Sequence, residues 1–312
     1  MNAPVAVPPG VLALAGERLR RQRETERRCL DLLRERGFEE VMLPVLEFAD
    51  GSEGGGYRFV DRSGRLLALR TDFTPLAARV LARGLAPSEL PLHVAYSGEV
   101  IRPREARLRQ LPELYQLGFE SYGVRGGGER ALRLALELTR RAGVPSGRVH
   151  VTVGRAGLAE KVLCQLLEEP ADQDLVELLH VRDVDRLAEA LGLSGHRLEA
   201  LAAAAMCEPP EAWAEALGVA EDVRDCRPLL DAARMEGADA TLDVAPRLAG
   251  GYYTGCVFAI WGPGTRAILA GGGEYAVEVA GTSVPAAGAC LTLGVALQEA
   301  AERSERGEGE WA

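Results

Sequence analysis

Hydrophobic and polar residues alternate along the stretch from Leu92 to Gly123 in two runs, separated by the arginine-rich segment RPREARLRQ. Alternation with a period of two is typical of strands whose two faces meet different surroundings. The stretch is therefore predicted to form two strands joined by a basic loop.

One face of these two strands combines polar groups with glycines. A glycine inside a strand weakens it unless something must come close to the backbone there. The residues on this face form one row on each strand, and we interpret the two rows as the floor of a small-molecule pocket. The alternative is a solvent-facing polar row on an antiparallel sheet. The first row holds Tyr96, Gly98, Val100 and Arg102, and the second holds Leu114, Gln116, Gly118, Glu120 and Tyr122.

The rest of the chain divides into helical and strand-like segments. Residues 1–10 are rich in proline and predicted to be loose, the body spans 11–303, and 304–312 is predicted to be a flexible tail. Helices are predicted from about Leu12 to Arg36, from near Pro75, over 126–143, in a leucine- and alanine-rich insertion near 157–236, and over Val284–Arg303. Strands are predicted in a hairpin that turns at Ser63-Gly64, over 148–154, and in three segments between 238 and 276.

Composition narrows the class of protein. A chain of 312 residues with 47% hydrophobic and 26% charged residues is ordinary for a globular protein, and its net charge of −10 disfavours broad nonspecific nucleic-acid binding. Six scattered cysteines favour a reduced, cytoplasmic setting. Four histidines without ligand spacing predict no metal site, and the absence of a phosphate-loop motif gives no reason to expect a cofactor. The sequence contains no recognisable signal peptide and no apolar run of membrane-spanning length.

Several motifs, in order along the chain, resemble those of the class II aminoacyl-tRNA synthetases, most closely the histidyl-tRNA synthetases and their paralogues. GFEEVMLPVLEFAD resembles motif 1, the Leu92–Gly123 stretch resembles motif 2, and PAAGACLTLGVAL resembles motif 3. Between them, GGYYTGCVFAIWGPG resembles the histidine-specific segment. The resemblance implies an α+β fold in which helices flank a mainly antiparallel sheet, with the helical insertion, without an anticodon-binding domain, and with dimerisation through the motif 1 region.

The same resemblance implies a set of site residues. Asp72 and Thr74 match positions that hold the amino group of histidine, and the alternative for this turn is a plain helix cap. The implied histidine-binding residues are Asp72, Thr74, Arg102, Gln116, Glu120 and Tyr253, and the candidate anion-binding residues are Arg109 and Arg247.

Three departures from the synthetase pattern argue against amino-acid activation by ATP. Val295 stands where motif 3 has its arginine, Leu248 stands where the histidine-specific segment has one, and Glu274 replaces the arginine of the G-G-R-Y-D segment. Cations stabilise the negative charge that develops on phosphate during activation, so their loss removes that stabilisation.

The segments Leu69–Pro75 and Tyr96–Arg102 resemble L-R-x-D-F-T-P and Y-S-G-E-V-x-R of the ATP phosphoribosyltransferase regulatory subunits. This resemblance implies a non-catalytic subunit that pairs with the short catalytic subunit, forms a homodimer within a hetero-oligomer, responds to L-histidine as effector and needs no tRNA. Two alternatives stay open at this stage, an enzyme that adenylates an amino acid and a scaffold that binds no small molecule. The sequence does not decide whether histidine binds this chain or the catalytic subunit.

Overall fold

The computed structural model describes residues 11, 13–49, 56–81, 84–102, 113–167, 170–246, 251–264 and 267–307. Its centre is an eight-stranded sheet in which most neighbours are antiparallel, while the β1–β5 and β7–β8 pairs are parallel. In spatial order the strands are β1 (Glu39–Glu40), β5 (Leu92–Ile101), β6 (Glu113–Tyr122), β11 (Thr282–Thr292), β10 (Ile268–Val279), β9 (Tyr253–Trp261), β7 (His150–Arg155) and β8 (Asp239–Leu242).

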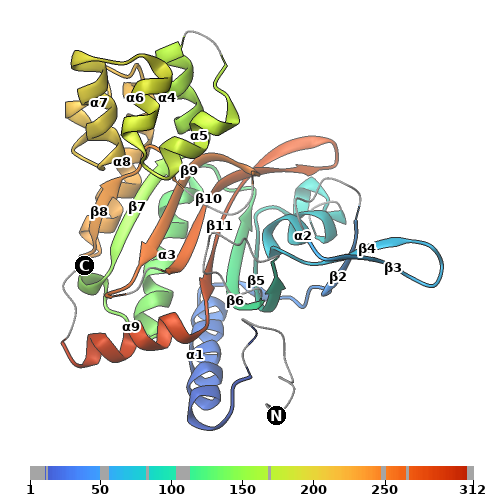
Figure 1. Cartoon of the computed structure of the whole chain (residues 1–312). Coiled ribbons are helices and arrows are strands. Elements are labelled where there is room, and N and C mark those ends of the chain that lie inside the picture. The colour runs from blue at the N-terminus through green and yellow to red at the C-terminus, as the bar shows by residue number, and fades with distance from the viewer. Residues whose placement is uncertain are drawn as a thin grey trace, which may run out of the picture.

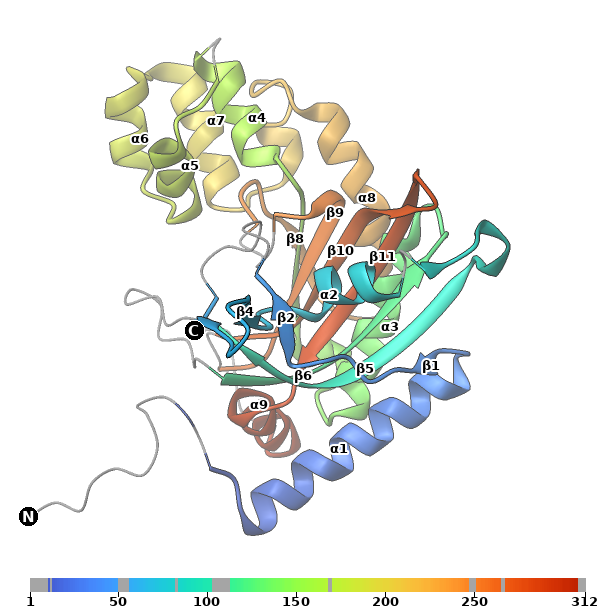
Figure 2. The ribbon, with the colours of Figure 1, turned by 90° about the vertical axis from the view of Figure 1, so that its right-hand side faces the viewer.

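Helices cover both faces of this sheet (Figures 1 and 2). α1 (Gly16–Glu35), α3 (Gly127–Arg141) and α8 (Ala220–Met235) pack on one face, and α3 lies across β10 and β11. The short α2 (Phe73–Val80) lies on the other face, and α9 (Val295–Glu305) follows β11 at the end of the described chain. The predicted α+β class, with helices flanking a mainly antiparallel sheet, is confirmed.

A group of helices projects from one end of the sheet, at the top of Figure 1, and corresponds to the predicted insertion. Its members are α4 (Leu158–Leu167), α5 (Gln173–His180), α6 (Val184–Leu191) and α7 (Gly195–Ala205), and α8 leads back to the sheet. Leu179, Leu201 and Trp213 are fully buried in it and belong to the same apolar core as the main sheet. Within the residues that the structure describes, no helix is both long and apolar enough to cross a membrane.

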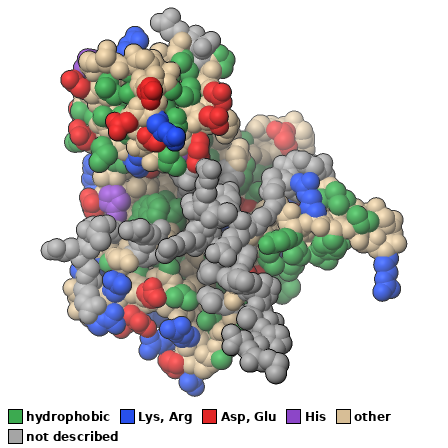
Figure 3. Space-filling model, viewed as in Figure 1, with side chains coloured by type: hydrophobic (Ala, Val, Ile, Leu, Met, Phe, Trp, Pro, Cys, Tyr) green, Lys and Arg blue, Asp and Glu red, His purple; other side chains and the backbone are tan. Residues whose placement is uncertain are grey.

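A separate three-stranded sheet presents an apolar face to solvent. It consists of β2 (Leu46–Phe48), β4 (Leu66–Leu69) and β3 (Arg58–Val60), in the order β2-β4-β3. Residues opposite one another in an antiparallel pair share a face, so the register places Leu46, Phe48, Phe59, Leu67 and Leu69 together. Phe48 is 63% exposed and Leu46 47%. Figure 3 shows hydrophobic side chains gathered over this sheet, which we call the apolar arm face.

The prediction of one helix over Val284–Arg303 is wrong in its first half. Residues Thr282–Thr292 form β11, and the helix α9 begins only at Val295. β11 lies between β10 and β6, where small residues are required because neighbouring side chains fill the space above them. A run of alanine and glycine with little alternation gave no period from which a strand could be predicted. The predicted tail overlaps α9 up to Glu305, while residues 1–10 and 308–312 lie outside the described residues.

Candidate functional site

Glu120 is the centre of a polar cluster on the α2 face of the sheet. Its side chain is fully buried in the middle of β6. Three hydroxyl groups donate to its carboxylate. Thr74 Oγ1 lies 2.6 Å and Tyr96 OH 2.8 Å from Oε1, while Tyr275 OH lies 2.6 Å from Oε2. The cluster therefore joins α2, β5, β6 and β10 around one carboxyl group.

Burial raises the pKa of Glu120 from an ordinary value of 4.5 to about 7, and the negative charge of Asp72 acts in the same direction. The three hydroxyl groups oppose this shift, because each stabilises the charged carboxylate. Burial likewise raises the pKa of Tyr96 and of Tyr275, with the neighbouring Glu120 charge adding to the effect. Glu120 thus changes its protonation state near neutral pH, while both phenols stay protonated and act as donors.

The start of α2 brings a second acidic group to the cluster. Asp72 precedes the helix and accepts a hydrogen bond from the backbone N–H of Thr74 at 3.1 Å, as a helix cap does. Its other oxygen, Oδ2, lies 3.3 Å from Tyr252 OH and 3.7 Å from a guanidinium nitrogen of Arg102. Burial raises the pKa of Asp72, and the charge of Arg102 lowers it. Asp72 is therefore a helix cap whose second oxygen also enters a polar network, and its side chain keeps 19% of its surface exposed.

The network extends to the predicted Tyr253. Its hydroxyl lies 3.3 Å from that of Tyr252, which in turn reaches Asp72. The two rings lie 4.5 Å apart. Gln116 stands two residues before Gly118 on the Glu120 face of β6 and is only 3% exposed.

Glycines in the predicted rows make room for protein side chains. A Cβ on Gly118 would come within 2.7 Å of the Tyr96 ring, and a Cβ on Gly288 would overlap Glu120 Oε2. The expectation that bare backbone at Gly118 marks an approaching ligand is therefore replaced by a simpler cause, since the Tyr96 ring fills that space.

The structure thus brings Asp72, Thr74, Arg102, Glu120 and Tyr253 into one network, with Gln116 on the same face. Arg109 and Arg247 lie outside the described residues. Sequence reasoning missed the roles of Tyr96, Tyr252 and Tyr275. For Tyr96 the signal was available, because it shares a row with Gly98 on a strand next to Glu120.

Glu274 lies on the face of the sheet opposite to Glu120. Its Oε1 accepts from the backbone N–H of Gly128 at 3.0 Å, at the start of α3, and its Oε2 accepts from the N–H of Cys256 at 3.2 Å. It follows Gly273 and precedes Tyr275, whose hydroxyl reaches Glu120 on the opposite face. Glu274 therefore lies outside the Glu120 cluster, so its replacement of the arginine does not add an anion there. Val295, the other departure in the described part of the chain, is the first residue of α9.

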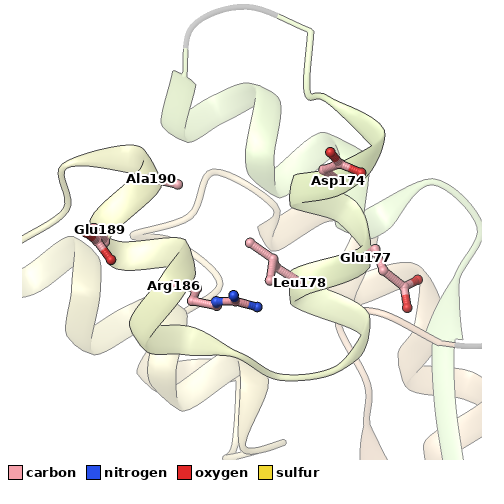
Figure 4. A pocket seen from close by; sticks show the side chains of 6 residues that line it. All are labelled: Asp174, Glu177, Leu178, Arg186, Glu189 and Ala190. Atoms are coloured by element: carbon pink, nitrogen blue, oxygen red, sulfur yellow. The ribbon is translucent and has the colours of Figure 1, made fainter. Parts of the chain in front are cut away.

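A hollow that does not involve this cluster lies between α5 and α6 of the insertion (Figure 4). It has a volume of about 580 Å³, and Leu178 and Arg186 extend into it from the two helices. Asp174, Glu177 and Glu189 add carboxylates to its rim. None of the predicted site residues lines it.

Comparison with known proteins agrees with this architecture. A family model described as histidyl-tRNA synthetase matches residues 10–295. An ATP phosphoribosyltransferase regulatory subunit from Moorella thermoacetica is 34% identical over 94% of this chain and 81% of its own length. Another from Anaeromyxobacter dehalogenans is 31% identical over 98% of this chain and 94% of its own.

Solved structures show the same fold. A Bacillus halodurans protein described as an ATP phosphoribosyltransferase regulatory subunit/histidyl-tRNA synthetase superposes with a TM-score of 0.77 at 21% identity, covering 95% of this chain and 83% of that one. A chain of the ATP phosphoribosyl transferase (HisG:HisZ) complex from Thermotoga maritima superposes with a TM-score of 0.65 at 23% identity, covering 88% and 98%. This chain belongs to the family of ATP phosphoribosyltransferase regulatory subunits, which share the fold of the histidyl-tRNA synthetases.

Proposed function

We propose that this chain is a non-catalytic regulatory subunit that binds and activates the short-form catalytic subunit of ATP phosphoribosyltransferase in the first step of L-histidine biosynthesis, in the cytoplasm. The names of its relatives support the assignment, and the Thermotoga maritima structure is a complex of two different components. The observation that carries the proposal is the combination of a buried polar site around Glu120 with Val295 at the start of α9. The chain keeps groups that can recognise an amino acid, and Val295 cannot supply the cation that would stabilise a developing charge on phosphate.

L-Histidine is the proposed effector, bound on the Glu120 face. The Glu120 carboxylate and the Tyr253 phenol would read the imidazole, since each pairs with a ring nitrogen as donor or acceptor. Asp72 and Gln116 would hold the ammonium group, with Thr74 and Arg102 completing the site. Three hydroxyl donors contact Glu120, whose two oxygens can accept about four hydrogen bonds, so an imidazole N–H can bind as a further donor or take the place of one hydroxyl. Regulation then follows if histidine binds the inhibited assembly more tightly than the active one.

The test is phosphoribosyl-ATP formation by the cognate catalytic subunit, with and without this chain, across a histidine titration. We expect activity that depends on this chain and falls as histidine rises. Glu120→Gln should make inhibition at least about tenfold less sensitive to histidine, because a hydrogen bond to a charged group contributes about 1.5–3 kcal/mol. Glu278→Gln, at an exposed position of β10, is the matched control. Catalytic activity indifferent to this chain, with no complex on a sizing column, would contradict the proposal.

A homodimer through the apolar arm face is the proposed state within the hetero-oligomer. Exposed clusters of large apolar residues mark association surfaces, and part of this face, Leu46 and Phe48, belongs to the motif 1 segment. Phe48→Asp should convert the dimer into a monomer in sedimentation velocity. Val181→Asp, at a 52% exposed apolar residue of the insertion, should leave the dimer intact. Equal sedimentation of both variants and the parent would contradict the assignment of this face.

Adenylation of an amino acid is the alternative function, and one feature of the structure favours it. Glu274 points away from the site and so does not oppose phosphate, and Arg102 lies beside Asp72. Histidine-dependent ATP–pyrophosphate exchange by the purified chain would establish this alternative. No exchange above that of an Arg102→Ala control is expected.

A further inference from the structure

Arg70 is a buried arginine that the site described so far does not use. It is 3% exposed and follows β4, two residues before Asp72. Its Nε donates to the carbonyl of Glu99 at 2.6 Å, and its Nη1 donates to the carbonyls of Leu43 at 2.7 Å and Pro44 at 3.2 Å. The guanidinium carbon also lies 4.1 Å from the centre of the Phe73 ring. The side chain is therefore fixed from three separate segments.

The charge of Arg70 is not matched by an ion pair. No carboxylate of the described residues lies within 4.0 Å of it, and Nη2 donates to no acceptor in that part of the chain. Burial lowers the pKa of Arg70, and the charges of Glu99 and Glu47 offset this only in part. Buried charges in proteins are normally paired, because an unpaired one loses its hydration without compensation. An anion that completes the pair is the simplest explanation for keeping a guanidinium here.

Gly98 shows which way the unused nitrogen faces. A Cβ built on Gly98 would come within 2.6 Å of Arg70 Nη2 and 3.3 Å of Phe73 Cζ. Side chains two apart in a strand share a face, so this Cβ would lie on the face of Tyr96. Gly98 is also directly opposite Gln116 in the β5–β6 register. Nη2 therefore lies against the space that a side chain at Gly98 would occupy, which we call the notch at Gly98. The notch is on the face that carries Glu120, next to the strand position of Gln116.

We infer that Arg70 is a specificity-determining residue of the ligand site, whose Nη2 binds the carboxylate of an α-amino acid. The inference rests on the proposed function, because it assigns the residue that binds the carboxylate of the proposed ligand, L-histidine. Asp72, two residues away, is placed to hold the ammonium end, so the pair matches the two charges of a zwitterion. Nε and Nη1 are held by carbonyls, and the contact is made by Nη2 alone.

The experiment compares two probes, L-histidine and L-histidinol, which differ by a carboxylate against an uncharged hydroxymethyl group. Titration calorimetry is run on the parent full-length chain, Arg70→Met, Arg70→Lys and Arg155→Met. Arg155 is an arginine of β7 that pairs with Asp222 and Asp225, remote from α2, and serves as the matched control. Circular dichroism first establishes that each variant is folded.

We expect the parent to bind histidine about tenfold to a hundredfold more tightly than histidinol, the range for a hydrogen bond to a charged group. Arg70→Met should bind the two probes within about threefold of each other. Arg155→Met should keep the parent ratio. If Arg70→Met does not fold, Arg70→Lys decides, because a lysine with a compact ammonium cannot hold the carbonyls and also reach the notch, and its ratio should fall at least about threefold.

A purely structural role for Arg70 would weaken both probes equally and leave the ratio unchanged, and that result overturns the inference while histidine binding stands. A parent that binds both probes equally also overturns it. If the parent binds neither probe, the proposed histidine site fails first, and the assignment of Arg70 fails with it.

Discussion

Two glutamates of the central sheet, Glu120 and Glu274, accept hydrogen bonds on opposite faces and from different kinds of donor. Glu120 is fully buried and receives three side-chain hydroxyls, from Thr74, Tyr96 and Tyr275. Glu274 is half-buried and receives two backbone N–H groups, from Gly128 and Cys256. A hydroxyl rotates and can change its partner, whereas a backbone N–H is fixed by the chain. The first arrangement suits a site that exchanges partners with a ligand, and the second suits a joint between helix and sheet.

The largest effect is expected from a substitution that fills the space that the Glu120 side chain occupies. In Gly288→Ala the new methyl group would overlap Glu120 Oε2 and lie 2.5 Å from the carbonyl oxygen of Phe119. Because neither the strand nor the packed carboxylate can move far, we expect a loss of about 3 kcal/mol or more in the free energy of unfolding. Urea melts measure it. Gly84→Ala, where no atom lies within 4 Å, should change stability by less than about 0.5 kcal/mol. Equal melts for both variants would contradict the tight contact at Gly288.

The next effect is the pH dependence of stability that Glu120 causes. Glu120 has a pKa of about 7 in the folded chain and near 4.5 when unfolded, so the folded state binds its proton more tightly. Its contribution to stability is therefore full below about pH 4.5 and is lost as the pH rises through about 7. Relative to Glu120→Gln, the parent should lose roughly 3 kcal/mol between pH 4.5 and 8, because a tenfold change in proton affinity corresponds to about 1.4 kcal/mol.

Urea melts of both proteins at several pH values give this difference directly. The Glu278→Gln control, at an exposed position, should run parallel to the parent at every pH. A parent-minus-variant difference that stays flat across the range would mean that Glu120 titrates as an ordinary carboxyl group.

Much of the fold follows from the order and period of the sequence pattern. The Leu92–Gly123 hairpin, the helical insertion and the α2 start could be predicted because each has a clear period or cap. β11 could not, since its alanines and Gly288 are chosen by what fills the space above them. That information belongs to Glu120 on the neighbouring β6, and the local sequence of β11 does not contain it.

The sequence predicted which residues belong to the site better than it predicted which side chains contact them. Glu120, Thr74 and Asp72 follow from the motifs, but Tyr96 and Tyr275 come from β5 and β10, and Tyr252 comes from the turn before β9. Glu274 shows the converse limit. One residue along a strand reverses the face, so a substitution beside Tyr275 that looks like a change in the site lies instead at the start of α3.

Glu274→Ala should sharpen the contrast between the two glutamates. Removing the carboxylate leaves the N–H groups of Gly128 and Cys256 without their acceptor, which should cost about 2 kcal/mol in the free energy of unfolding. Histidine affinity should stay within about twofold of the parent, because the side chain lies on the other face. Calorimetry that instead showed a tenfold loss would place Glu274 in the ligand site.

Tyr275→Phe should give the smallest effect, and one that depends on pH. The variant removes the donor to Glu120 Oε2 and keeps the ring. A hydrogen bond to a charged carboxylate contributes more than one to a neutral carboxyl group, so the loss should be about 1 kcal/mol larger at pH 8 than at pH 5. The pKa of Glu120 should rise further for the same reason, since one of the groups that stabilise its charged form is gone. Tyr57→Phe, at a 47% exposed tyrosine, should show no such pH dependence in the same melts. A loss that is equal at both pH values would mean that Tyr275 contributes only its packing, and that the hydroxyl shell does not set the charge of Glu120.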